Sequence, residues 1–320
     1  MIYDLGAMVI SIVILAVASE KFVTSSRVIS RKIGLSDLLA GVVIVGFASS
    51  LPEIATSVLA SYSGHSDIAL SQVVGSTTIN VTIVSAISAL AATPLIPSTT
   101  IKREGAAAVA GALVLLLVVG LGGERYFGPL LIVLFAAFTV FVLKGAAEHR
   151  AHAAKHAKPA VEIQNRPQTG EARPASGKVV LTGLVSLVLT LGAAEVFLKG
   201  ALALASRMGI SGGFVGGVIL ALGASLPEIA TAIQAARKGA AALVVGNVLG
   251  ASYLTCTLAA GLTLSIRPLA TPNLELASTA AMAVSVCLLW VFLLTGKRLS
   301  RLEGVFLIIF YGVFLATLGI

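Results

Sequence analysis

Charged residues are scarce in this chain of 320 residues. Asp, Glu, Lys and Arg together make up 11% of it, hydrophobic residues make up 57%, and the mean hydropathy is +1.02. A soluble domain of this size needs far more charge on its surface, so the composition indicates a polytopic membrane protein in a lipid bilayer. The net charge of +8 is spread between apolar runs that leave no solvated basic face, which argues against a nucleic-acid partner.

Cysteine and the usual signatures of catalysis are also rare. Cys256 and Cys287 both lie in apolar runs, which disfavours a disulfide or a CxxC site. The sequence has no HExxH motif and no evident base beside its many serines, so we expect neither an intramembrane hydrolase nor any cofactor. Asp4 and the lack of a basic lead-in before the first apolar run disfavour a cleaved signal peptide.

Ten apolar stretches each have about the 20 residues that a bilayer crossing requires. They cover residues 4–22, 36–62, 67–95, 104–122, 127–146, 178–203, 211–237, 240–265, 274–295 and 302–320. A polar stretch with three prolines separates the fifth from the sixth and is typical of a flexible linker. The chain is therefore expected to divide into a first repeat, 1–146, a cytoplasmic linker, 147–177, and a second repeat, 178–320.

Basic residues are distributed unevenly over the loops that this division creates. If the N-terminus is outside, 18 of the 22 basic residues fall on the inner side, and only Arg125, Lys199, Arg207 and Arg267 fall on the outer side. The positive-inside rule then predicts a plasma-membrane protein with both termini outside.

The two halves of the chain repeat each other at a constant offset of 175 residues. Residues 48–56 read A-S-S-L-P-E-I-A-T and residues 223–231 read G-A-S-L-P-E-I-A-T, and the same register aligns Gly75 with Gly250. Because each half holds an odd number of spans, the second half must enter the membrane in the opposite sense. The sequence thus predicts an all-α polytopic membrane protein with ten transmembrane helices arranged as two inverted five-helix repeats.

Each repeat places a proline and a glutamate deep in an apolar run, as Pro52-Glu53 and Pro227-Glu228. A carboxylate at bilayer depth is costly, and a proline removes a backbone hydrogen bond that lipid cannot replace. Each glutamate lies about 17 residues into its span, which at a rise of about 1.5 Å per residue is near the midplane. We therefore predict that both glutamates contribute to one cation site.

Other oxygen donors accompany the two glutamates. Hydroxyls precede each acid by three or four residues, and hydroxyl and amide side chains recur in the following span of each half. Such hard donors suit Ca²⁺, which takes about 6–8 oxygens, and Na⁺ by the same logic. The alternative is that a hydroxyl in a membrane helix bonds its own backbone. The candidate ligands are Glu53, Glu228, Asn80, Ser50, Ser225, Ser49, Ser76, Thr77, Ser252 and Thr255.

These stretches resemble the α-repeats of the cation/calcium antiporter superfamily, and within it the prokaryotic type of the sodium/calcium exchanger family. The family signature is close to G-T-S-L-P-E followed by G-N-V-[IV]-G-S-N-[IV]-x-[ND]. Here the first part stands at 48–53 and 223–228, and the second reads S-Q-V-V-G-S-T-T-I-N at 71–80 and G-N-V-L-G-A-S-Y-L-T at 246–255. The resemblance implies ions bound among helices two, three, seven and eight, with Glu53 and Glu228 as the main ligands.

The resemblance also implies a function: a secondary active antiporter, working as a monomer, that exchanges Ca²⁺ for Na⁺ by alternating access. The alternatives are H⁺ as the coupling ion, another divalent cation, or a passive cation channel. Three departures bear on this, because Thr255 stands where many members carry an acid, Ala251 replaces a serine, and Gln72 replaces an asparagine. With two carboxylates the site holds a charge of −2, so we predict an exchange closer to electroneutral.

Overall fold

The computed structural model describes residues 2–32, 50–96, 98–140, 177–209, 211–237 and 241–319. In chain order the first half contains α1 (Ile2–Lys32), α4 (Leu51–Tyr62), α5 (Ser66–Ile79), η2 (Asn80–Val84), α6 (Ser85–Ala92), α7 (Ser98–Thr100), η3 (Ile101–Gly105) and α8 (Ala106–Gly120), where η marks a π-helical segment. A further apolar helix covers Phe127–Val140.

The second half is equally helical. It contains α10 (Gly177–Met208), α11 (Gly212–Phe214), η4 (Val215–Leu220), α12 (Ala221–Arg237), α13 (Ala241–Leu254), η5 (Thr255–Ala259), α14 (Ala260–Ile266), α15 (Pro272–Gly296) and α16 (Arg301–Thr317). Within the described ranges the only β pairing is an isolated bridge between Leu95 and Arg298. The helical class predicted from composition is therefore confirmed.

Seven helical stretches in the described ranges are long and apolar enough to cross a membrane. They are Leu5–Phe22, Ser66–Ala92, Ile101–Gly120, Gly177–Met208, Gly212–Ile229, Val244–Ile266 and Glu275–Gly296. Each overlaps a different one of the ten expected stretches, and the shorter helices α4, Phe127–Val140 and α16 overlap the other three. The chain is a multi-pass membrane protein, while the count of ten spans remains a prediction. Residues 147–176 of the expected linker and residues 36–49 of the stretch 36–62 lie outside the described residues, and Gly177 is the first residue of α10.

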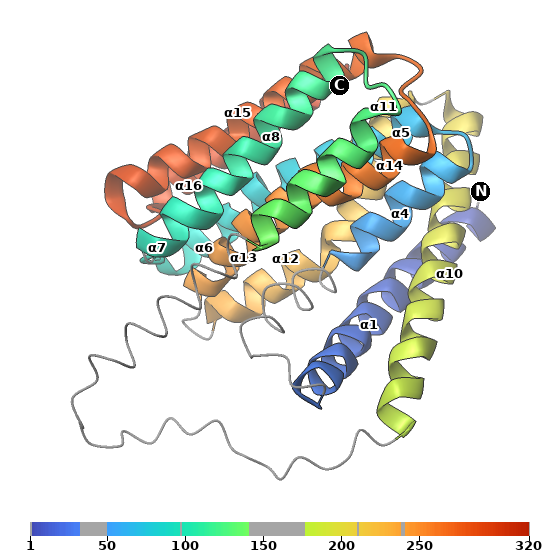
Figure 1. The fold of residues 1–320 in the computed structure, drawn as a ribbon, viewed down its shortest axis with the longest axis horizontal. Coiled ribbons are helices and arrows are strands. Elements are labelled where there is room, and N and C mark those ends of the chain that lie inside the picture. The colour runs from blue at the N-terminus through green and yellow to red at the C-terminus, as the bar shows by residue number, and fades with distance from the viewer. Residues whose placement is uncertain are drawn as a thin grey trace.

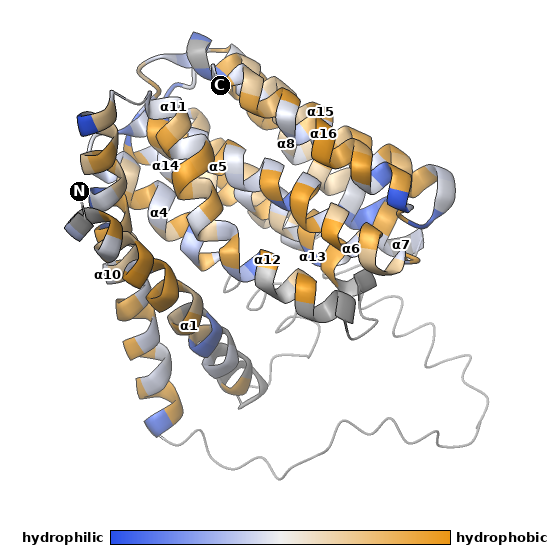
Figure 2. Ribbon diagram, turned by 180° about the vertical axis from the view of Figure 1, so that it is seen from behind, coloured by the Kyte–Doolittle hydropathy of each residue, from blue (hydrophilic) through white to orange (hydrophobic). Residues whose placement is uncertain are grey.

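The outer faces of the long helices are apolar, as the orange bands on α1, α10, α15 and α16 show (Figure 2). Val188 on α10 and Ile309 on α16 are 68% and 60% exposed. Large aliphatic side chains exposed in this way along whole helices are costly in water and favourable against lipid. Their placement agrees with the membrane location that the composition predicts.

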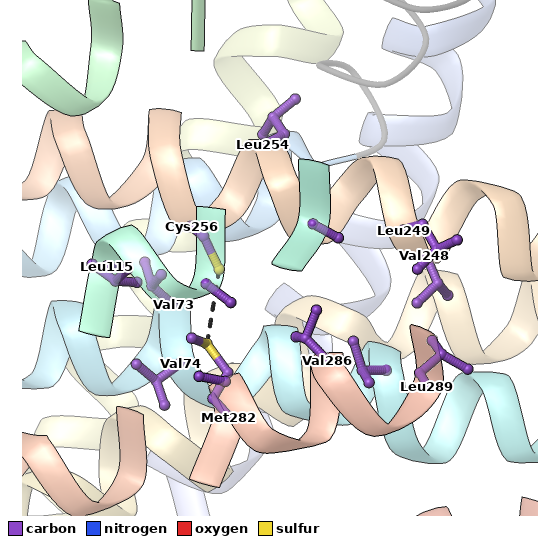
Figure 3. Close-up of a cluster of buried hydrophobic side chains, with 14 of the residues drawn as sticks. Val73, Val74, Leu115, Val248, Leu249, Leu254, Cys256, Met282, Val286 and Leu289 are labelled. Carbon is purple, nitrogen blue, oxygen red and sulfur yellow. Dashed lines mark hydrogen bonds between the residues drawn. The ribbon is translucent and has the colours of Figure 1, made fainter. Parts of the chain in front are cut away.

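The helices are held together by two hydrophobic clusters. The larger one joins α5, η5, α8, α13 and α15, and in Figure 3 Val73, Leu115 and Met282 surround Cys256, whose Sγ lies 3.8 Å from the Met282 Sδ. The smaller one includes Leu15 of α1 and Phe197 of α10. These two long helices run side by side at one edge of the molecule (Figure 1), and α10 contacts α4 and η4. The α1–α10 pair is thus attached through its own cluster.

Glycines bring η4 and α5 into direct backbone contact. A Cβ added at Gly75 would lie 2.1 Å from the carbonyl oxygen of Gly217, and one added at Gly216 would lie 2.3 Å from the carbonyl oxygen of Ile68. Only residues without a side chain allow two helices to approach this closely, as is common within membranes. This contact holds η4 of the second half against the helix of the first half that carries Ser76 and Asn80.

Candidate cation site

The two glutamates predicted from the repeat lie close to each other. Glu53 is in the first turn of α4 and is 1% exposed, and Glu228 is partly buried in α12, which packs against α4, α5 and η2. The carboxyl group of Glu53 is near enough to interact electrostatically with Glu228, and it forms a hydrogen bond with the side-chain amide of Asn80. Residues from the two halves therefore converge on one place, where α12 packs against α4 and against the continuous helix formed by α5 and η2.

Five of the candidate ligands share an unusual property. Each carries a buried side-chain oxygen that has no hydrogen-bond partner within the described part of the chain: Glu53 Oε2, Ser76 Oγ, Asn80 Oδ1, Ser225 Oγ and Glu228 Oε2. We call these five residues the central cluster. Most buried polar atoms in proteins are paired, and an unpaired one costs about 1–3 kcal/mol. Five such oxygens from both halves are what a site for a dehydrated cation requires.

Three other candidate ligands have their hydroxyl groups engaged elsewhere. Ser252 donates to the Val248 carbonyl oxygen at 2.7 Å and Thr255 donates to the Ala251 carbonyl oxygen at 2.8 Å. The Thr77 Oγ1 lies 3.9 Å from the Sγ of Cys256. The hydroxyl groups of Ser252 and Thr255 therefore bond to the backbone of their own helix, which was the alternative to ion binding in the sequence analysis.

The two remaining candidates precede Glu53 directly. Ser50 is buried and is the residue at which α4 begins, since its carbonyl oxygen accepts the first helical hydrogen bond from Ile54 N at 3.0 Å. Pro52 follows within the first turn, where its missing N–H is tolerated. Ser49 lies outside the described residues.

The backbone around the site is irregular at matching positions of the two repeats. The π-helical segment η2 begins at Asn80 and η5 begins at Thr255, exactly one repeat offset apart in sequence. In α12, Pro227 lies inside the helix and has no N–H to bond the Gly223 carbonyl. A π-helical turn and an internal proline both release backbone carbonyls, and π-turns are frequent at functional sites.

The oxygen donors of the central cluster indicate which cations it could hold. Among the described residues no three His, Cys, Asp or Glu side chains group together as metal ligands. A cation at the central cluster would therefore be held by two carboxylates and by neutral hydroxyl and amide oxygens. Oxygen-only sets of this kind suit Na⁺ and Ca²⁺, whereas zinc and copper favour nitrogen and sulfur.

Two further buried polar side chains were not among the candidates from sequence. Glu275 of α15 is 4% exposed and accepts hydrogen bonds from Ser71 Oγ at 2.7 Å and Ser278 Oγ at 3.4 Å. Gln72 of α5 is 0% exposed, and both its amide oxygen and nitrogen lack a partner in the part of the chain that the structure describes. Glu275 opens an apolar stretch in the sequence and nothing there sets it apart from a surface acid, while Gln72 stood out only as a departure from the family signature.

Comparison with known proteins assigns the family. The sequence profile described as "Sodium/calcium exchanger protein" matches residues 3–144 and, a second time, residues 178–319. The chain belongs to the sodium/calcium exchanger family. The two matched ranges begin and end 175 residues apart, which is the offset of the internal repeat.

Individual relatives agree with this membership. The sodium/calcium exchanger MaX1 of Methanosarcina acetivorans is 27% identical over 97% of this chain and 97% of its own. The human sodium/potassium/calcium exchanger 2 is 33% identical over 28% of this chain and 14% of its own. The solved structure of the sodium-calcium exchanger NCX_Mj soaked with Na⁺ and Sr²⁺ has a TM-score of 0.67 at 23% identity, covers 98% of both chains, and so has the same fold.

Proposed function

We propose that this exchanger-family chain is a secondary active antiporter that moves Ca²⁺ against Na⁺ by alternating access. The observation that carries the proposal is the central cluster, in which five buried oxygens without partners come from both halves of the chain. Family membership supports the reaction, and the chemistry of the donors supports the ions.

In this proposal Glu53 and Glu228 are the principal ligands, because they are the only two carboxylates in the central cluster. Asn80, Ser76 and Ser225 supply neutral oxygens, as does the buried Ser50. Ser49 stays a candidate ligand from the sequence alone. Thr77, Ser252 and Thr255 reach an ion only if their present contacts break.

The architecture we propose has ten transmembrane helices in two inverted repeats, with both termini outside. The π-turns at repeat-related positions, the double profile match and the distribution of basic residues support it.

The α1–α10 pair would be the moving part, since its own small cluster attaches it to the rest. Phe197 of α10 presses on α12 at Gly223, where an added Cβ would lie 2.2 Å from the ring, and so links that pair to the helix of Glu228.

Charge balance sets the proposed stoichiometry. Two carboxylates hold −2 when ionised, and one Ca²⁺ or two Na⁺ neutralise them, so the loaded site can cross the low-dielectric interior while the empty charged site cannot. Because Thr255 brings no third carboxylate, we propose an exchange that is close to electroneutral.

The test is radiolabelled Ca²⁺ uptake into proteoliposomes of the purified monomer, driven first by an outward Na⁺ gradient and then by an outward H⁺ gradient. Uptake with the Na⁺ gradient is expected, whereas uptake with the H⁺ gradient alone would replace Na⁺ by H⁺ in the proposal. Unlabelled external Ca²⁺ should accelerate release of the labelled ion. A channel would not give this counterflow, and its absence in the presence of passive Ca²⁺ leakage would overturn the antiporter assignment.

A further inference from the structure

One face of α5 carries a row of buried polar side chains that continues beyond the central cluster. Gln72, Ser76 and Asn80 are spaced four residues apart, which places them above one another on a helix. Their side chains are 0%, 0% and 2% exposed. Gln72 is thus one turn, or about 5.4 Å, beyond Ser76 on the same face.

The lack of hydrogen-bond partners is confined to this face. In the described part of the chain, both amide atoms of Gln72, the Ser76 Oγ and the Asn80 Oδ1 are unpaired. On the other faces of the same helix, Ser71 Oγ donates to Glu275 and Thr78 Oγ1 donates to the Val74 carbonyl oxygen. The row is therefore a specific feature of one face.

The contacts of neighbouring residues show which way this face looks. Ile68 and Ala69, one turn before Gln72, pack in the small cluster with Phe197 and other residues of α10. On the flank, an added Cβ at Gly216 of η4 would lie 3.0 Å from the Gln72 backbone nitrogen. Gln72 accordingly lies where η4 packs on α5, one turn from the small cluster that contains Phe197.

We propose that Gln72, sharing Ser76 with the central cluster, forms a second cation position at the outer end of that cluster, at which a partly hydrated Ca²⁺ or Na⁺ halts on its way to or from one side of the membrane. The Gln72 Oε1 and the Ser76 Oγ coordinate the ion, and the Gln72 amide nitrogen donates to a hydration water that the ion retains. This use accounts for both unpaired atoms of the amide, since one accepts the cation and the other holds its water. The inference rests on the proposed transport of these ions.

The repeat provides a matched residue for testing. Asn247 occupies the position of Gln72 in the second half, on α13, and is exposed. Under the inverted arrangement the two residues lie toward opposite membrane surfaces. A change at Gln72 should therefore alter ion access from one surface only, and a change at Asn247 should alter access from the other.

The experiment measures the half-saturating Ca²⁺ concentration of Na⁺-coupled exchange on each side, in right-side-out and in inverted vesicles from the same cells. For Gln72→Leu we expect a rise of about tenfold on one side and less than about twofold on the other, since a ligand used only on entry changes one apparent affinity. Asn247→Leu should show the opposite sidedness. Gln72→Asn keeps a shorter amide and should give a smaller, still one-sided shift.

Equal shifts on both sides, or no shift on either, would assign Gln72 to packing and overturn the proposal.

A second measurement separates this result from failure of the transport function or of folding. The melting temperature of detergent-solubilised protein is measured with and without millimolar Ca²⁺, after size-exclusion chromatography of each variant. If the wild type does not exchange ions, the function proposed above fails. The second position is still supported if Ca²⁺ raises the melting temperature less in Gln72→Leu than in the wild type. An equal rise in the two proteins refutes it.

Discussion

Two groups of carboxylates in this molecule differ in the number of hydrogen bonds that their oxygens accept. Glu275 accepts from Ser71 and Ser278, and nearby Asp67 accepts from the backbone nitrogens of Ala270 and Thr271. In the central cluster, Oε2 of both Glu53 and Glu228 has no partner in the described residues. The first group ties α5 to α15 and to the turn before it. Burial of an acid alone thus does not predict an ion ligand, and the proposed site rests instead on the carboxylate oxygens that are left without a donor.

The largest effect that follows from this comparison is at the central acids. Glu53→Gln and Glu228→Gln each remove one of two negative charges that face the ion, and both should lower Na⁺-driven Ca²⁺ uptake by about 100-fold or more. Initial uptake rates in proteoliposomes at matched protein density measure this. Full activity of either variant would mean that the carboxylate is not a ligand.

A third acid should change the electrical character of transport. Thr255→Asp adds a carboxylate at the position where many members carry an acid. The charge of the proposed site then becomes −3, so neutralisation requires one more positive charge per cycle. We expect wild-type Ca²⁺ uptake to be nearly insensitive to an imposed potassium diffusion potential, and the variant to change several-fold with its sign, since moving one charge through 100 mV is worth about 2.3 kcal/mol. Strong voltage dependence in the wild type would refute the electroneutral proposal.

Serine substitutions test the distinction between free and bonded hydroxyl groups. Ser225→Ala removes an unpaired oxygen of the central cluster and should raise the half-saturating Ca²⁺ concentration by about 3- to 10-fold, in line with the loss of one oxygen ligand. Ser252→Ala removes a hydroxyl that donates to the Val248 carbonyl oxygen, and it should change the half-saturating Ca²⁺ concentration by less than about twofold. The same flux assay compares them, and a reversed order would show that the back-bonded hydroxyl is released when the ion binds.

The smallest effect on transport is expected at Glu275. Glu275→Ala leaves the Ser71 hydroxyl without its acceptor and should lower the free energy of unfolding by about 1–3 kcal/mol, while exchange of the folded protein stays within about twofold of the wild type. Thermal unfolding in detergent and uptake per folded molecule measure the two quantities. A loss of transport comparable with that of Glu53→Gln would remove the difference between the two groups of acids.

The sequence was sufficient to predict the helical membrane class and the proximity of Glu53 and Glu228, because an exact repeat of a costly motif has few physical explanations. It was not sufficient to separate Ser225 from Ser252. Both are small hydroxyl residues in apolar helices, and whether each bonds its own backbone depends on the local helix geometry and on neighbours distant in sequence. The π-turns at Asn80 and Thr255 likewise have no signature in composition or periodicity.

Gln72 and Glu275 are two buried polar residues that sequence reasoning did not select as candidates. Their neighbours along the chain predict nothing unusual, and their importance depends on which helix packs opposite them. Glu275 meets Ser71 across 204 positions of sequence, a contact that no local pattern encodes.

The meeting of Gly75 with Gly217 has a mechanical consequence. With one peptide group resting on another, there is no layer of side chains that could change rotamer and absorb a displacement, so α5 and η4 behave as one rigid piece. Any rearrangement that opens a path to the ions must therefore take place at softer junctions. In the proposed mechanism that junction is the one that joins the α1–α10 pair to the rest of the molecule, while the glycine contact stays fixed.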